Sequence, residues 1–186
     1  MRLQMFRRIY SSAIAMSVLC SLHGAVMSQQ KGTAKSHLRP QHREAVEQWL
    51  AQRSNLRLAV DGDCVCKSHL AAERAGSDSY RYHPYYHSSD FNGDKKEDFA
   101  IVLVNTQKRT AKFAIAVFNG PVGKDSGPAF FREGLDLRRM AFTAADGIED
   151  ARRTSLFVEN PNTGKGWILR LGRKGYFLGR SETDFN

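Results

Sequence analysis

The spacing of apolar residues changes from helical to strand-like about halfway along the chain. In the first half, Ala45, Val46, Trp49 and Leu50 form one apolar stripe with helical spacing, which predicts a helix from residue 40 to about residue 52. A second, shorter helix is predicted around residues 68–75, where Gly76 follows as a stop signal. Both predicted helices precede the strand-like half of the sequence.

From Phe99 onwards, apolar runs of strand length are separated by turns rich in Gly and Asn. The predicted strands cover residues 99–105, 112–118, 139–143, 154–159, 166–171 and 175–179. Helices followed by consecutive strands predict an α+β fold in which N-terminal helices pack on a mainly antiparallel β-sheet. We expect residues 40–186 to form a single domain of this kind.

Residues 1–28 have the pattern of a secretory signal peptide. Arg2, Arg7 and Arg8 give a positive start, and the stretch from Ile9 to Leu22 contains no charged residue. This apolar stretch is shorter than the roughly 20 residues that a retained membrane-spanning helix needs. The sequence therefore predicts an exported protein, periplasmic or extracellular, with a flexible mature N-terminus at residues 29–39 and no transmembrane segment after cleavage.

The charge balance favours anionic surfaces as partners and argues against nucleic acid. The net charge is +9 and decreases by three when the basic residues of the signal peptide are removed. A mildly basic exported domain is attracted to anionic envelope polymers or lipid headgroups. Its basic residues form only short clusters without a nucleic-acid-binding signature, at Arg138–Arg139, Arg152–Arg153 and Arg170 to Lys174.

The residues with the most specific chemistry form one loop, Asp90-Phe91-Asn92-Gly93-Asp94-Lys95-Lys96-Glu97-Asp98. Short side chains bearing oxygen occupy its first, third, fifth and ninth positions, which are Asp90, Asn92, Asp94 and Asp98, and the carbonyl of Lys96 can add a backbone oxygen. Ca²⁺ takes about six to eight oxygen ligands of these kinds. The spacing therefore predicts a calcium site. The alternative is an acidic turn without metal, because Asp, Asn and Gly are favoured in turns for reasons unrelated to ions.

The sequence around this loop separates it from one calcium-binding family and relates it to another. An EF-hand loop needs Gly at its sixth position and Glu at its twelfth, where this chain has Lys95 and Ile101. An apolar run follows directly, and DFNGDKKEDFAIVL resembles the loop-then-strand unit of FG-GAP repeats, also called VCBS or integrin-like repeats. The resemblance implies calcium ligation by Asp90, Asn92, Asp94 and Asp98.

Two further features of this resemblance matter for the structure. FG-GAP loops usually carry Gly where this chain has Lys95, at a position where the backbone needs φ > 0. The motif occurs once, so length and the absence of repeats exclude a multi-blade propeller. A wider span, from His83 to Pro121, resembles small exported bacterial proteins that carry one such motif.

Cys64 and Cys66 are the two cysteines that remain after removal of the signal peptide. In an oxidising compartment we expect them to form a disulfide with each other. Two alternatives remain open: a redox-active or intermolecular thiol pair, and a soft-metal site completed by His69 or nearby aspartates.

Four tyrosines, Tyr80, Tyr82, Tyr85 and Tyr86, come directly before the calcium-type loop. Tyrosine supplies rigid contact area with a polar tip and is enriched where binding energy concentrates, so these residues are a candidate partner-binding surface. The alternative is that they pack against the sheet.

These features together favour an exported calcium-binding module of FG-GAP type that binds an envelope protein or a polysaccharide. No catalytic residue is predicted, because no nucleophile with an adjacent base is recognisable. Two other functions remain open: an inhibitor or immunity-type protein against an envelope hydrolase or toxin, and a small hydrolase that uses the metal of the loop.

Overall fold

The computed structural model describes residues 37–76, 82–123, 125–148 and 150–181. The predicted signal peptide, most of the predicted flexible segment at residues 29–39, and Tyr80 lie outside these ranges. Neither helix in the described ranges has the length and apolar character needed to cross a bilayer.

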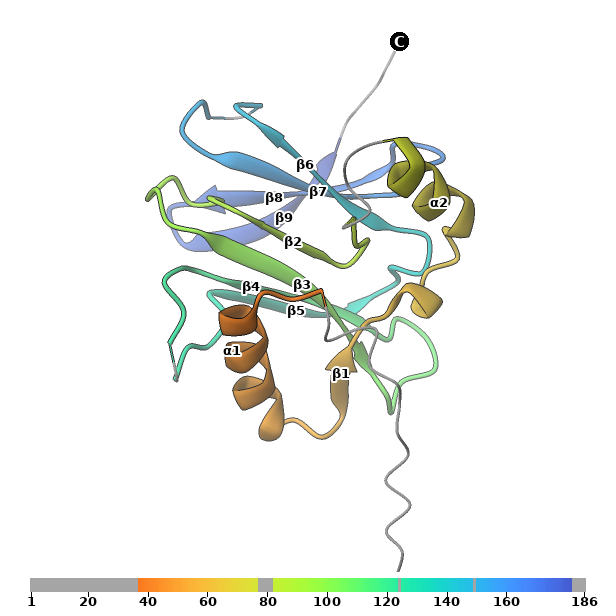
Figure 1. Cartoon of the computed structure of the whole chain (residues 1–186), viewed down its shortest axis with the longest axis horizontal. Helices are drawn as coiled ribbons and strands as arrows, with labels where there is room; N and C mark the ends of the chain where they lie inside the picture. The colour runs from red at the N-terminus through yellow and green to blue at the C-terminus, as the bar shows by residue number, and fades with distance from the viewer. Residues whose placement is uncertain (1–36, 77–81, 124, 149, 182–186) are drawn as a thin grey trace, which may run out of the picture. The chain divides into compact units, whose positions relative to one another are not determined.

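Two helices and nine strands follow one another along the described chain (Figure 1). Pro40 opens the first helix, at a position where its missing N–H has no helical partner to lose. The elements are α1 (Pro40–Ala51), β1 (Leu56–Leu58), α2 (Lys67–Gly76), β2 (Tyr86–Ser89), β3 (Asp98–Asn105), β4 (Phe113–Phe118), β5 (Phe130–Leu135), β6 (Ala141–Asp146), β7 (Thr154–Glu159), β8 (Gly166–Gly172) and β9 (Gly175–Ser181), with a short 3₁₀ helix at Asp61–Asp63.

The strands form two antiparallel sheets. In the first sheet, β3 pairs with β4, and β4 pairs with β5. The other edge of β3 is shared by two short strands: β2 lies opposite Asp98–Ile101 and β1 lies opposite Leu103–Asn105. The second sheet is a simple meander in which β6, β7, β8 and β9 pair in chain order. The sheets face each other, with β2 beside β6 and β5 beside β9.

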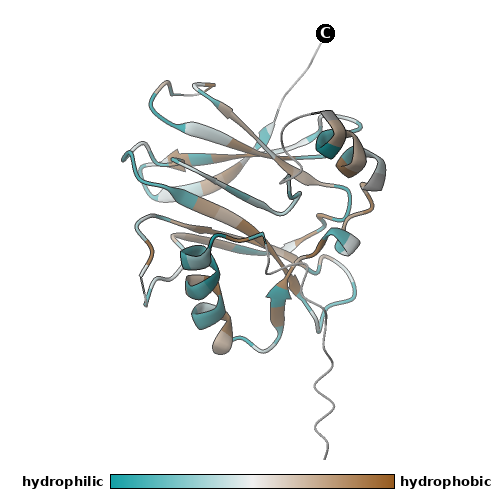
Figure 2. Cartoon of the chain, viewed as in Figure 1, coloured by the Kyte–Doolittle hydropathy of each residue, from teal (hydrophilic) through white to brown (hydrophobic). Residues whose placement is uncertain are grey.

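The alternation of side chains along β3 divides the core into two layers. Ala100, Val102 and Val104 point into a cluster shared with the second sheet. Phe99, Ile101 and Leu103 point the other way, into a cluster that includes residues of α1. Because both faces are covered, β3 and β4 read as continuous apolar runs. Figure 2 shows hydrophobic colouring along β3.

The predicted fold class, α+β with N-terminal helices packed on one antiparallel sheet, is wrong. The protein is mostly β, with two antiparallel sheets and two short helices. The inner face of the first sheet is covered by the second sheet, since β6 to β9 have an apolar face of their own. The two predicted helices and the six predicted strands are confirmed within a few residues.

A candidate calcium site between the two sheets

The acidic loop connects β2 to β3 at a place where the first sheet meets the second. The carbonyl oxygen of Asp90 accepts a hydrogen bond from the backbone N–H of Thr154, the first residue of β7, at 2.8 Å. One residue earlier, the hydroxyls of Ser89 and Thr154 are hydrogen-bonded to each other. The loop is thereby attached to both sheets.

Side-chain oxygens fix the loop by accepting hydrogen bonds from its own backbone. The Asp90 carboxylate accepts from the N–H of Gly93 at 2.6 Å and from that of Lys95 at 2.8 Å. Asn92 Oδ1 accepts from Asp94 N, and Asp94 Oδ1 accepts from Lys96 N, each at 2.8 Å. A carboxylate has about four acceptor positions and an amide oxygen has two. Asp90, Asn92 and Asp94 therefore keep acceptor capacity for another ligand.

The backbone at Lys95 has the left-handed conformation for which FG-GAP loops usually carry Gly. Its φ is 65°, and Gly93 two residues earlier has φ of 82°. Outside Gly, a left-handed residue costs roughly 1–2 kcal/mol. The backbone therefore turns tightly at this position, although a lysine occupies it.

Asp98 is fully buried and its carboxylate is surrounded by donors. Its Oδ1 accepts from Gly120 N at 2.8 Å, and its Oδ2 accepts from Phe91 N at 3.0 Å and Asn92 N at 3.2 Å. The Tyr176 hydroxyl on β9 lies 3.4 Å from the same Oδ2 and donates to Asn119 Oδ1 at 2.9 Å. The three backbone donors take up most of the acceptor capacity of the carboxylate. In this conformation Asp98 organises the loop and links it to the second sheet.

The electrostatics of the loop favour a cation. Burial raises the pKa of Asp98, hydrogen bonds from Gly120 and Phe91 oppose this increase, and the charges of Asp94 and Asp90 add to it. Burial also raises the pKa of Tyr176, with Asp98 contributing next. The three carboxylates are therefore close enough to destabilise one another's charge, and a bound cation would relieve this repulsion.

The donor set fits a hard cation. Among the described residues, no three His, Cys, Asp or Glu side chains gather in a metal-binding arrangement. The loop, however, offers mixed oxygen donors: two carboxylates from Asp90 and Asp94, the Asn92 amide, and the Lys96 carbonyl. Such all-oxygen sets are the ones that Ca²⁺ uses. The side chains of Lys95 and Lys96 are exposed.

The described tyrosines of the predicted partner-binding surface all have hydrogen-bond partners within the fold. Tyr85 is 4% exposed, and its hydroxyl donates to the Leu137 carbonyl at 3.2 Å. Half-buried Tyr82 donates to the Phe142 carbonyl at 3.1 Å. The hydroxyl of Tyr86, also half-buried, lies 2.9 Å from His42 Nδ1. This arrangement agrees with the alternative that these tyrosines pack against the sheet. Tyr80 lies outside the described residues.

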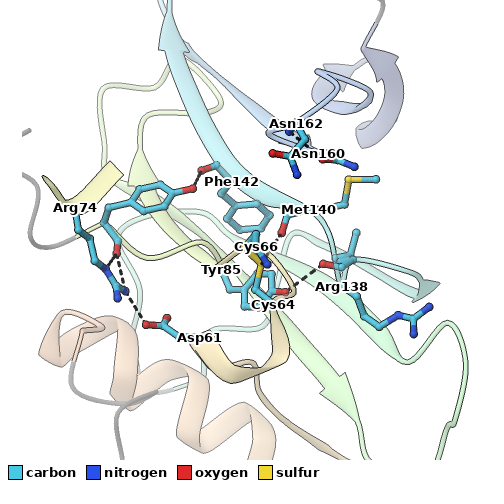
Figure 3. Close-up of a disulfide and its surroundings, with 12 residues drawn as sticks. Asp61, Cys64, Cys66, Arg74, Tyr85, Arg138, Met140, Phe142, Asn160 and Asn162 are labelled. Atoms are coloured by element: carbon cyan, nitrogen blue, oxygen red, sulfur yellow. Dashed lines mark hydrogen bonds and ion pairs between the residues drawn. A yellow bond between two sulfur atoms is a disulfide. The ribbon is translucent and has the colours of Figure 1, made fainter. Parts of the chain in front are cut away.

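Cys64 and Cys66 form a disulfide just before α2 (Figure 3). Both are buried, whereas Val65 between them is 68% exposed, and its N–H donates to the Arg138 carbonyl at 2.7 Å. The paired sulfurs leave no thiolate for a soft metal. His69, proposed as a further ligand, instead lies 3.8 Å from Glu73.

Sequence reasoning missed the residues that hold the loop from a distance. Gly120 and Tyr176 contact Asp98 from 22 and 78 residues further along the chain. No local pattern marks either residue, because their roles depend on strand pairing and on the stacking of the two sheets.

Comparisons of the chain with protein-family models, with curated proteins and with solved structures found no match.

Proposed function

We propose that the protein is an exported, non-enzymatic binding module whose Asp90–Asp98 loop takes up Ca²⁺. The observation that supports this most is the position of the loop. Burial, with the charges of Asp94 and Asp90 adding to it, raises the pKa of Asp98, and the Asp90 carbonyl accepts a hydrogen bond from Thr154 of the second sheet. Asp90, Asn92, Asp94 and the Lys96 carbonyl would hold the ion.

The role of the ion in this proposal is structural. A cation among Asp90, Asp94 and Asp98 would lower the repulsion between them and stabilise the connection between the sheets. The two neighbouring lysines reduce the local negative charge, so we expect weak affinity, in the range of roughly 10⁻⁴ to 10⁻³ M seen for extracellular calcium modules.

Thermal unfolding with and without calcium tests the proposal. A ligand that binds only the folded state stabilises it by roughly 1.4 kcal/mol when its concentration is ten times Kd. We expect Ca²⁺ to raise the Tm of the wild-type protein relative to a chelator, and Asp94→Ala to abolish this increase. Asp136→Ala is the control, because Asp136 is an exposed acidic residue outside the loop that pairs with Arg138.

The control variant should keep the full calcium-dependent increase. Equal Tm values for the wild-type protein in calcium and in chelator would contradict the proposal. So would a calcium-dependent increase that Asp94→Ala retains in full.

A further inference from the structure

The outer edge of β9 is an open strand edge. This strand ends the second sheet and, in the described chain, pairs with β8 alone. In an antiparallel pair, residues that bond the neighbouring strand alternate with residues whose backbone groups point away from it. The β8–β9 hairpin closes with Gly172 opposite Gly175, so the N–H and carbonyl groups of Tyr176, Leu178 and Arg180 point away from β8. These groups have no backbone hydrogen-bond partner among the described residues.

The other strand edges in the described chain are protected. At the edge of β6, Phe142 N donates to the Pro84 carbonyl, and the Phe142 carbonyl accepts from the Tyr82 hydroxyl. The strands β1 and β2 have three and four residues, and the pairing of β5 contains a register shift. Short edge strands and bulges prevent strand edges from pairing with other chains. By contrast, β9 has seven residues in unbroken register with β8, and its Phe177 is 46% exposed.

The side chains of β9 are complementary to a second copy of the same strand. When two copies pair antiparallel about a two-fold axis at Leu178, Phe177 lies opposite Gly179 of the other copy, and Tyr176 lies opposite Arg180. The exposed phenylalanine ring then lies over a residue without a side chain and loses contact with water. The second pair brings a guanidinium beside an aromatic ring.

The charges at the two ends of β9 are also complementary to a second copy. The turn before β9 contains Arg173 and Lys174, which are exposed, and the sequence after Ser181 contains Glu182 and Asp184. Antiparallel pairing brings the beginning of one β9 to the end of the other, so basic and acidic residues meet at both ends of the pair. A uniformly acidic or basic segment of another protein would be attracted by one end and repelled by the other.

We propose that the protein forms a dimer in which β9 pairs with β9 of a second copy, so that the two second sheets join into one. The two-fold axis closes the open edge of both copies, and the joined sheet ends at the protected edge of β6 in each. Because each copy contributes a single strand, we expect a weak, reversible dimer, of the kind seen below roughly 1,200 Å² of buried area. This inference goes beyond the proposed function and does not depend on calcium uptake.

Sedimentation velocity over a range of protein concentrations tests the proposal. We expect the wild-type protein to change from monomer to dimer as its concentration rises. Arg180→Pro removes an N–H that points away from β8, so it spares the hairpin and should weaken association about a hundredfold. Arg180→Ala is the matched control, which keeps this N–H and should weaken association about fivefold at most. Circular dichroism at low concentration checks that each variant is folded.

Charge reversal tests the two ends of the pair without altering β9 itself. Arg173→Glu combined with Lys174→Glu places an acidic turn beside the acidic end of the other copy, so association should weaken about tenfold. Adding Glu182→Lys and Asp184→Lys to this variant makes the two ends complementary again and should restore the wild-type affinity.

Reversal of the exposed pair Arg138 and Arg139, between β5 and β6, is the control for net charge and should leave association unchanged. A wild-type protein that stays monomeric at every concentration would overturn the inference and leave this edge to an extended segment of another protein. Equal association of Arg180→Pro and Arg180→Ala would also overturn it, as would equal effects of the two arginine-containing reversals, at residues 173–174 and 138–139. The Tm response to Ca²⁺ is a separate measurement, which none of these outcomes decides.

Discussion

Gly93 and Lys95 both have φ in the left-handed region, at 82° and 65°, within a loop otherwise held by side-chain oxygens. The Asp and Asn residues accept the backbone N–H groups that this path turns inward. The acidic residues therefore have a structural role in addition to the proposed role as ligands. The backbone at Gly93 is the part of this arrangement that a single substitution tests most cleanly.

We expect Gly93→Ala to lower the free energy of unfolding by roughly 1–2 kcal/mol, because a Cβ is disfavoured at this φ. Steric overlap does not contribute, since the nearest atom to an added Cβ, the Arg152 carbonyl oxygen, would be 3.7 Å away. Gly123→Ala is the matched control, at a glycine with open space around it and no positive φ. Urea unfolding in chelator measures both variants, and an equal loss in the two would contradict this interpretation.

At the scale of residues, the sequence shows which side chains of the loop carry oxygen atoms, but it does not show which residues support the loop. The spacing of Asp90, Asn92 and Asp94 is a local property and is visible in the sequence. The sequence also shows that Lys95 stands where FG-GAP loops usually carry Gly, and the backbone at Lys95 has the positive φ expected at that position. The carboxylate of Asp98, the fourth predicted ligand, accepts from the backbone of Phe91, Asn92 and Gly120, and only the tertiary fold brings Gly120 near.

At the scale of elements, burial explains which strands the sequence revealed. The strands β3 and β4 are buried on both faces and appear as unbroken apolar runs. The three strands that sequence analysis missed lack such a signal: β1 has three residues, β2 is the polar segment YHSS, and β5 is largely exposed. The second sheet was missed as a separate layer because hydrophobic spacing does not state which strands pair.

The packing of the two sheets predicts that replacing one phenylalanine by alanine lowers the free energy of unfolding strongly, and that replacing another lowers it only slightly. Phe142 on β6 is 1% exposed and belongs to the cluster between the sheets, so Phe142→Ala should cost about 3–5 kcal/mol. Phe177 on β9 is 46% exposed, and Phe177→Ala should cost about 0.5 kcal/mol. Chemical denaturation of both variants measures the difference. Similar losses would show that the second sheet does not pack as described.

At the scale of the whole molecule, the lowered pKa values of two histidines predict that stability depends on pH. His42 is fully buried, stacks on Phe99 at 4.1 Å, and its Nε2 has no hydrogen-bond partner within the described chain. Burial lowers the pKa of His42 from its ordinary 6.5. The His83 ring stacks on His37 at 3.6 Å; burial, and next the charge of His37, lowers the pKa of His83 to about 4.

We expect the free energy of unfolding to decrease as the pH falls from 6.5 to about 4. In this window the unfolded chain binds protons that the folded His42 and His83 do not, and this difference favours unfolding. The raised pKa of Asp98 acts in the opposite direction as the pH falls towards the ordinary carboxyl pKa of 3.8.

Urea unfolding in chelator at several pH values measures this dependence, and His83→Gln should reduce its slope. Stability that stays constant or increases over the window would contradict the prediction. An unchanged slope in His83→Gln would assign the effect to other groups.

The two short strands that share one edge of β3 have a consequence for behaviour in concentrated solution. Regular, exposed strand edges recruit strands from other chains, and β3 and β4 are apolar segments without proline, of the type that forms fibrils when exposed. Here β1 and β2, of three and four residues, pair with the outer edge of β3. The outer edge of β4 is covered by β5, whose pairing contains a register shift and whose Gly134 has a positive φ. We therefore expect the folded protein to resist amyloid formation, which would first require these covering strands to detach.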